Sequence, residues 1–293
     1  MALTQTEIAA FHDEGVLVVE GLVGAADLAP VIAEYAQWID CRARELAAEG
    51  KISDLCETAR VKHRLALLYA QSPEISKDMD IMTVRGPATF EFLHNASLLD
   101  AVESLVGPEI TCNPIQHIRA KPPGALSGEG AGFYNVPWHQ DAGVTWQEAD
   151  DSNIVTCWIA LTDATVENGC MEVMPGAWKG GYREHQAEGG TTIRPDLLPQ
   201  IPPRAVPVRK GGVVFMHRYT PHRSTPNYTE GVRWSLDIRY QPTGVPTGRP
   251  FHPDFVVRSR KYPASVLNDH TEWSRLWVDA LANSKGIKAH RVK

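Results

Sequence analysis

The chain has 293 residues, of which 43% are hydrophobic and 22% charged, and this length and apolar content are enough to bury a full core. The formal net charge of -6 and the scatter of the basic residues argue against a nucleic-acid groove. The N-terminus lacks the basic-then-apolar order of a signal peptide and no apolar run reaches membrane-spanning length, so we expect a cytoplasmic protein without a membrane span.

Residues 1–107 are expected to form a mostly helical cap. A short helix and then a strand open the chain, with Gly15 at the turn between them. Over residues 25–48 apolar residues recur at helical spacing, which predicts a long amphipathic helix. Residues 60–107 predict further helices, and a Gly-Pro pair ends the last of them.

From residue 108 the chain changes to short apolar runs broken by Gly, Pro, Asn and Asp. This texture is typical of a β-sandwich or a closed double sheet, so residues 108–245 predict a β core. Residues 246–293 form a C-terminal extension with an apolar-periodic helix from Thr271 to Leu281, followed by a basic end that we expect to fray. We expect all three parts to belong to one domain.

His139 and Asp141 are two residues apart, just before a run of strand-like segments. On an extended segment such side chains point the same way, so one imidazole and one carboxylate can share a small ion. A second His would complete the two-His, one-carboxylate face of a non-haem Fe(II) site and leave other positions open. Such pairs also arise by chance, because the sequence has 11 His and a second pair occurs at His252 and Asp254.

His222 is the candidate third ligand because of the residues that follow it. Arg233 lies eleven residues further along, and Ser235 lies two beyond Arg233, on the same face of a predicted strand. A guanidinium fork grips a carboxylate through two hydrogen bonds, and a hydroxyl adds a donor. The pair suits the distal carboxylate of 2-oxoglutarate, whose keto-acid end would chelate iron and leave one position for O₂. No Arg stands at the same interval after His270, which is the next His beyond Asp254.

Other residues remain as weaker candidates. Gln116 or Lys121 could reach a bound acid, although an exposed or edge-strand role fits them equally, and strand alternation puts them on opposite faces. His217 lacks the eleven-residue interval to Arg233, so we interpret it as a pocket or structural residue. The Gly-rich segment 124–132 and the long stretch 179–207, which has no clear periodicity, are candidate lids.

Together these motifs resemble the phytanoyl-CoA dioxygenase family of Fe(II)- and 2-oxoglutarate-dependent oxygenases. The resemblance is carried by residues 138–141, 158–164, 167–170 and 220–224 and by Arg233. It implies a double-stranded β-helix, the jelly-roll or cupin-like core, within a mainly β fold that also has α structure, an N-terminal helical cap and a C-terminal helix. It implies that the iron ligands are His139, Asp141 and His222, that Arg233 anchors 2-oxoglutarate and that Trp158 packs beside it. Where the family often has Pro-Gly-Ser-His, this chain has Pro-Gly-Ala-Trp at residues 175–178.

The resemblance implies an enzyme that hydroxylates an unactivated C–H bond of a small metabolite or natural-product intermediate, with release of succinate and CO₂. The same oxidising chemistry permits desaturation, cyclisation or epimerisation, and ligand motifs do not separate these outcomes. Halogenation is disfavoured because Asp141 is retained, whereas halogenating relatives have a small residue there. The alternative from another class is a cupin-like barrel that binds a metal or ligand without oxygenating it, or a hydrolytic Zn²⁺ site. A monomer and a homodimer both remain open.

Overall fold

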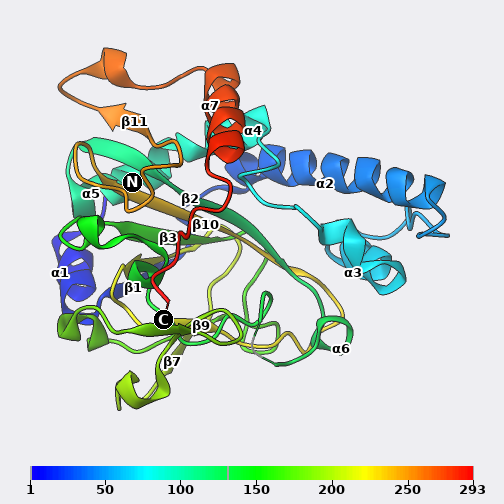
Figure 1. The fold of residues 1–293 in the computed structure, drawn as a ribbon, viewed down its shortest axis with the longest axis horizontal. Helices are drawn as coiled ribbons and strands as arrows, with labels where there is room; N and C mark the ends of the chain where they lie inside the picture. The colour runs from blue at the N-terminus through cyan, green and yellow to red at the C-terminus, as the bar shows by residue number, and fades with distance from the viewer. Residues whose placement is uncertain (1, 131, 293) are drawn as a thin grey trace.

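The computed structural model describes residues 2–130 and 132–292, and it shows a mixed α/β fold with antiparallel sheets (Figure 1). Its helices are α1 (Gln5–Glu14), α2 (Ala25–Ala48), α3 (Val61–Gln71), α4 (Pro87–Leu93), α5 (Ala96–Val106), α6 (Gly124–Ser127) and α7 (His270–Asn283). Its strands are β1 (Val16–Val19), β2 (Glu109–Lys121), β3 (Val155–Ala160), β4 (Met171–Val173), β5 (His185–Ala187), β6 (Thr191–Ile193), β7 (Arg204–Val206), β8 (Val213–His217), β9 (His222–Ser224), β10 (Arg233–Pro242) and β11 (Phe255–Ser259). Among the described helices, none is long and apolar enough to cross a membrane.

The opening helix and strand follow from local sequence signals. The Thr4 hydroxyl accepts a hydrogen bond from the Glu7 amide (3.3 Å), and the Glu7 carboxylate accepts one from the Thr4 amide (2.8 Å), so α1 begins with a capping box. Gly15 ends the helix with a φ of +73°, a conformation that costs glycine little. The chain then enters β1, and this predicted order of helix, turn and strand is confirmed.

The main sheet has six strands in the order β1-β8-β3-β10-β2-β11, and every neighbouring pair is antiparallel. β10 lies between β2 and β3, so both of its edges are hydrogen-bonded. Because side chains alternate along a strand, Arg233, Ser235, Asp237 and Arg239 share one face of β10. The other face carries Leu236, Ile238 and Tyr240, which join the large hydrophobic core beneath the helices.

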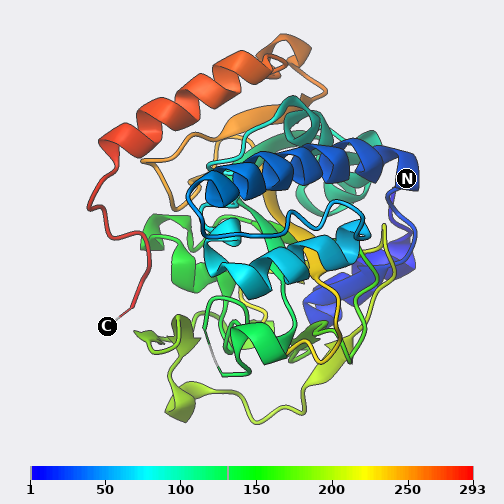
Figure 2. The same ribbon diagram turned by 90° about the vertical axis from the view of Figure 1, so that its right-hand side faces the viewer.

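Helices cover the apolar face of the main sheet. Figure 2 shows α2 and α3 lying across it, and α5 contacts β2, β3 and β10. The buried positions of α2 recur at helical spacing, as the sequence predicts: Leu28, Val31, Tyr35, Ile39, Ala43 and Leu46. In α7, Trp273 and Trp277 lie four residues apart and are both fully buried. The helical layer thus closes one face of the sheet and leaves the polar face for other contacts.

A smaller sheet of three strands, in the order β7-β4-β9, lies on the polar side of the main sheet. A second hydrophobic cluster includes residues from both sheets, among them Trp158 of the main sheet and Met171 and Val173 of β4. Residues of both sheets also line one cavity, and the candidate site lies in this cavity between them.

Two expectations about irregular segments are corrected. Residues 179–207 are not free of regular structure, because they contain the β5–β6 hairpin and strand β7, each strand only three residues long. The end of the chain beyond residue 284, which we expected to fray, contacts the rest of the molecule up to residue 292. It runs from α7 back across the molecule toward the small sheet, drawn in red in Figure 1, and Val292 forms a parallel bridge with His185.

Candidate active site

His139 and His222 are brought together by backbone pairing. The amide of each donates a hydrogen bond to the carbonyl of the other, both at 3.0 Å, and the ring centroids lie 4.1 Å apart. Asp141 begins a single 3₁₀ turn directly after the extended Gln140. One ligand atom from each of these three residues lies within 4.8 Å of the others, so the structure unites the predicted triad.

Both imidazoles are oriented by their backbone neighbours. Nδ1 of His139 lies 2.9 Å from the Pro137 carbonyl, and Nδ1 of His222 lies 2.9 Å from the Thr220 carbonyl. A carbonyl only accepts, so each Nδ1 carries the proton and each Nε2 keeps its lone pair. His222 Nε2 points toward Asp141 and lies 4.0 Å from its Oδ1. Burial lowers the pKa of His139 to about 3, which keeps this ring neutral.

The Asp141 carboxylate is held on both oxygens. Thr156 donates its hydroxyl proton to Oδ2, and the guanidinium of Arg239 donates to Oδ1. Burial acts to raise the pKa of Asp141, but the charge of Arg239 and the hydrogen bond that it donates outweigh this effect and hold the pKa below its usual range. The carboxylate is therefore ionised and fixed in place.

This donor set fits a divalent transition metal. Two neutral imidazole nitrogens and one carboxylate on one side of a cavity match the non-haem Fe(II) arrangement, with further positions facing the open space. Gln140, between two of the ligands, points the other way and bonds to the carbonyls of Gly181 and Tyr219, each at 2.8 Å. Its side chain thereby fixes the segment that carries the ligands.

The triad opens into a cavity of about 600 Å³, a size typical of small-molecule sites. β2 and β10 form one wall, and the residues around Phe133 and the β5–β6 turn form another. The cavity is lined by charged side chains as well as apolar ones. Its basic residues are Arg119, Lys121, Arg233, Arg239 and Arg249, and its acidic residues are Asp80, Asp141 and Asp237.

Arg233 is a buried cation in the wall of this cavity. Its Nη1 donates to Ser235 Oγ (2.8 Å), its Nη2 donates to Ser224 Oγ (3.3 Å), and its guanidinium stacks 5.0 Å from the Trp158 ring. Burial lowers the pKa of Arg233 to about 10, so it stays charged at neutral pH. No described carboxylate forms an ion pair with it. Ser235 is fully buried behind Arg233 and orients this side chain without lining the cavity.

Lys121 lies opposite Arg233 in the β2–β10 register and lines the same end of the cavity. Its ammonium donates to Asn135 Oδ1 (3.1 Å) and to the Thr225 carbonyl. Burial, followed by the charge of Arg233, lowers the pKa of Lys121 to about 6. A protonated Lys121 would be repelled by Arg233 in this poorly solvated place, and a bound dianion would relieve that repulsion.

The structure does not bring Gln116 to this cavity. Its side chain is buried on the opposite face of β2, where its amide donates to the Asn113 carbonyl (3.0 Å) and to Cys112 Sγ (3.1 Å). Strand alternation explains the difference, because Gln116 and Lys121 cannot face the same side. His217 packs against Trp178, with ring centroids 4.4 Å apart, and His252 packs against Trp277 at 5.1 Å. Neither His lines the cavity.

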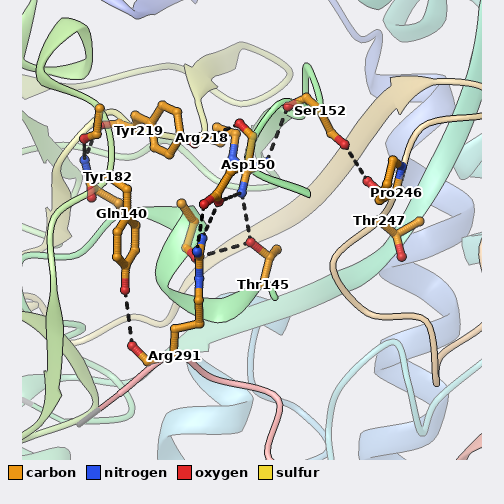
Figure 3. A network of polar contacts seen from close by, with 12 residues as sticks. Gln140, Thr145, Asp150, Ser152, Tyr182, Arg218, Tyr219, Pro246, Thr247 and Arg291 are labelled. Carbon is orange, nitrogen blue, oxygen red and sulfur yellow. Dashed lines mark hydrogen bonds and ion pairs between the residues drawn. The ribbon is translucent and has the colours of Figure 1, made fainter. Parts of the chain in front are cut away.

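The end of the chain supplies contacts that no local pattern indicates. Figure 3 shows Arg291, whose two terminal nitrogens donate hydrogen bonds to the two carboxylate oxygens of Asp150. These bonds are 2.6 and 2.9 Å long. The Arg291 guanidinium also donates to the Ala142 carbonyl (2.9 Å), and its amide donates to the Gly143 carbonyl (2.9 Å). These residues follow Asp141 directly, so the tail is fastened beside the triad. Its neighbour His290 reaches the rim of the cavity.

Comparison with curated proteins identifies relatives of known name. Peroxisomal phytanoyl-CoA dioxygenase of Rattus norvegicus is 28% identical over 239 residues, which are 78% of this chain and 66% of that protein. A methylphosphonate hydroxylase of Gimesia maris is 33% identical over 128 residues, which are 40% of this chain and 48% of that protein. The chain thus matches slightly less than two thirds of the length of the first relative and about half of the second.

Two solved structures share the fold. The apo form of the non-haem monooxygenase ThoJ superposes with a TM-score of 0.64 at 18% identity, covering 94% of this chain and 98% of that chain. The carbocyclase SnoK from nogalamycin biosynthesis superposes with a TM-score of 0.52 at 19% identity, covering 91% and 94%. The model of the family described as phytanoyl-CoA dioxygenase matches residues 11–235, which include the whole triad and Arg233. On that match over most of its length, the chain belongs to the phytanoyl-CoA dioxygenase family.

Proposed function

We propose that this protein is an Fe(II)- and 2-oxoglutarate-dependent oxygenase that hydroxylates a C–H bond of a small molecule. One observation carries the proposal: an oriented His139, Asp141 and His222 triad shares a cavity with Arg233, a buried cation that has no carboxylate partner among the described residues. Membership of the phytanoyl-CoA dioxygenase family supports the same chemistry. The name of the hydroxylase relative supports hydroxylation as the outcome.

We propose further that the two sheets are the halves of a double-stranded β-helix. The antiparallel order of the main sheet, the position of the small sheet against its polar face and the site between them support this reading. α1 to α5 then form the N-terminal cap, and α7 is the C-terminal helix.

Each residue of the site has a distinct task in this proposal. His139 and His222 would bind Fe(II) through Nε2, and Asp141 would bind it through its carboxylate. Iron bound there supplies the activation of O₂ that the protein's own side chains cannot provide. Arg233 and Lys121 would hold the distal carboxylate of 2-oxoglutarate, while the hydroxyls of Ser224 and Ser235 keep the Arg233 fork in position. Trp158 gives the co-substrate chain a flat apolar wall.

The burial of these groups matters as much as their identity. Asp141 and His222 are almost inaccessible to solvent, and Arg233 is 2% exposed. Charge-assisted hydrogen bonds made in such a place are stronger than those made in water. The site therefore favours binding of an anionic keto acid.

A hydrolytic zinc site is the rival from another class, because two His and one Asp also suit Zn²⁺. Such a site needs only water as its reactant. It has no use for a paired Arg233 and Lys121 beside the metal, whereas a co-substrate with a distal carboxylate does. The Arg233 and Lys121 pair favours the oxygenase.

The visible absorption of the Fe(II)-loaded protein under anaerobic conditions tests the proposal. Addition of 2-oxoglutarate should produce a new charge-transfer band, because the keto acid would chelate iron. The variant Asp141→Ala should show no band at the same iron concentration. A folded, iron-loaded wild type without a band would contradict the oxygenase and favour the metal-binding or hydrolytic barrel.

A further inference from the structure

The cavity has two chemically separate ends. Arg233 and Arg239 lie six residues apart on the same face of β10, which corresponds to about 20 Å along an extended strand. Arg233 and Lys121 mark the end assigned above to 2-oxoglutarate. Arg239 bonds to Asp141, and Arg233 bonds to Ser224, two residues from His222, so the metal triad lies between these two arginines. The cavity continues past Arg239 to Arg249 and His290, and this part is the distal end.

Arg249 is a buried cation at the distal end. It is 7% exposed, and its Nε donates to the Val144 carbonyl at 2.7 Å, which fixes the plane of the guanidinium. Its two terminal nitrogens make no hydrogen bond to any residue that the structure describes. Burial, followed by the charge of Arg239, lowers the pKa of Arg249 to about 10, so it remains charged at neutral pH.

The carboxylates that line this part of the cavity are already engaged. Asp80 Oδ2 lies 2.8 Å from His117 Nδ1, and Asp237 forms an ion pair with Arg239 at 3.4 Å. Asp141 is held by the same Arg239. Within residues 2–130 and 132–292, no acidic side chain is paired with Arg249. A buried charge without a partner is costly, so an anionic ligand would be favoured there.

His290 completes the distal end from the C-terminal tail. Its Nδ1 lies 2.6 Å from the Thr191 hydroxyl on the β5–β6 hairpin, and its other ring nitrogen has no described partner. The bonds of Arg291 to Asp150 and to the Ala142 carbonyl hold the tail in this place. The distal end therefore offers a fixed guanidinium and an imidazole on the same cavity.

We propose that the substrate is a small acid, and that Arg249 binds its carboxylate, phosphonate or phosphate group with His290 at the rim beside it. This inference rests on the proposed oxygenase and names its substrate class. The two free terminal nitrogens of Arg249 form the fork that such planar or tetrahedral oxyanions accept. The remaining length of the substrate then extends from Arg249 toward the triad.

The position of Arg249 also sets the size of that acid. Its Nε bonds to Val144, three residues after Asp141 in one 3₁₀ turn, which rises about 2 Å per residue. The backbone that holds Arg249 is therefore about 6 Å from the ligand Asp141 along this turn. A short acid places its carbon atoms over the triad from there. A long acyl thioester, whose charged groups lie far from the reacting carbon, does not fit this arrangement.

The test is a binding experiment with the anaerobic protein loaded with Fe(II) and 2-oxoglutarate. Short-chain carboxylates and alkylphosphonates, methylphosphonate included, are titrated by calorimetry, each beside its neutral amide or ester. At least one acid should bind, and its neutral partner should not. Arg249→Gln should weaken binding of that acid at least tenfold while the charge-transfer band of the bound 2-oxoglutarate stays unchanged. Arg260→Gln, which removes an exposed arginine paired with Glu103 outside the cavity, should bind as the wild type does.

The outcomes separate the two proposals. A wild type with the band but with no preference for acids over neutral partners would overturn the inference and leave the oxygenase intact. An Arg249→Gln variant that binds the acid as tightly as the wild type would do the same. Loss of the band on adding an acid would show that the acid displaces 2-oxoglutarate from the iron, which also contradicts binding at Arg249. A wild type that never forms the band would refute the oxygenase, and this inference would fall with it.

Discussion

Arg239 donates a hydrogen bond to Asp141, and these two side chains, 98 residues apart in sequence, are among the most deeply buried charged groups in the described structure. Thr156 holds the second oxygen of the same carboxylate. The orientation of Asp141 thus depends on strands β3 and β10 rather than on the His-x-Asp segment itself. Hydrogen bonds of this kind, one step removed from a metal, tune how tightly the ligands bind it.

Replacing Arg239 with Gln should weaken Fe(II) binding by about 10- to 100-fold, the usual effect of losing a partner of a metal ligand. The change should also destabilise the fold by about 3 to 5 kcal/mol, because it leaves the buried Asp141 charge without its cation. Anaerobic titration against a chelator and thermal unfolding measure the two effects. Arg239→Lys, which retains the charge, should recover part of both losses. A folded Gln variant with wild-type iron affinity would remove Arg239 from this role.

Replacing Arg233 with Ala should raise the concentration of 2-oxoglutarate needed for turnover and leave iron binding intact. A hydrogen-bonded charge contributes about 1.5 to 3 kcal/mol, which corresponds to about 10- to 100-fold in affinity. Ser235→Ala is the matched control and should cause a smaller rise, because Ser224 still holds the other terminal nitrogen of Arg233. Equal 2-oxoglutarate affinity in Arg233→Ala and the wild type would exclude Arg233 as the anchor.

Binding of 2-oxoglutarate at pH 8 should be accompanied by uptake of up to one proton. In the free protein the pKa of Lys121 is lowered to about 6, so this amine is mostly neutral at pH 8, while its ordinary pKa lies near 10.5. A carboxylate bound beside it favours the ammonium form and raises the pKa again. Calorimetry in buffers of different ionisation enthalpy counts the protons. Lys121→Met should abolish the uptake, and persistence of the uptake in that variant would assign it to another group.

The same shift has a consequence for stability without the co-substrate. Between pH 6 and pH 10.5 the unfolded chain binds a proton at Lys121 that the folded chain does not. The contribution of Lys121 to the free energy of unfolding therefore increases as the pH rises through this window. Thermal unfolding of the wild type and of Lys121→Met at both pH limits measures this effect. The stability that Lys121→Met gains over the wild type should be larger at the lower pH.

Replacing Arg291 with Ala should loosen the C-terminal tail without unfolding the protein. The Arg291–Asp150 pair is only partly buried, so we expect a loss of stability of about 1 kcal/mol. Hydrogen exchange of residues 284–292 should become faster, and the Michaelis constant for the substrate should rise while that for 2-oxoglutarate stays the same. Arg275→Ala, which removes an exposed arginine of α7, is the control. Unchanged exchange in the tail would show that Arg291 does not fasten it.

The parts of this structure that the sequence predicts are those with a local or a fixed-interval signal. The helix from Ala25 to Ala48 is visible because its apolar residues repeat at a helical period. His139 and Asp141 are visible because two residues on an extended segment share a direction. His222 is visible only through its interval to Arg233, which the β9 and β10 strands then place at one cavity.

The parts that the sequence does not predict depend on contacts between distant segments. Arg291 meets Asp150 across 141 positions, and neither residue belongs to a motif. The strands within residues 179–207 are three residues long, too short for alternation to show. Gln116 differs for another reason: strand alternation puts it on the side opposite Lys121, but alternation alone does not say which of the two sides faces the cavity.

The pairing of β1 with β8 determines when the main sheet can be completed during synthesis. Val16 lies opposite Met216, a residue that leaves the ribosome roughly 200 positions later. Until then the edge of the main sheet next to β8 cannot form, and contacts of such long sequence separation are associated with slow folding. During synthesis the apolar Val16–Val19 segment has no strand to pair with until β8 is made. An unpaired strand can pair with another chain and so promote aggregation. The Val16–Val19 segment thus stays unpaired until β8 has been synthesised.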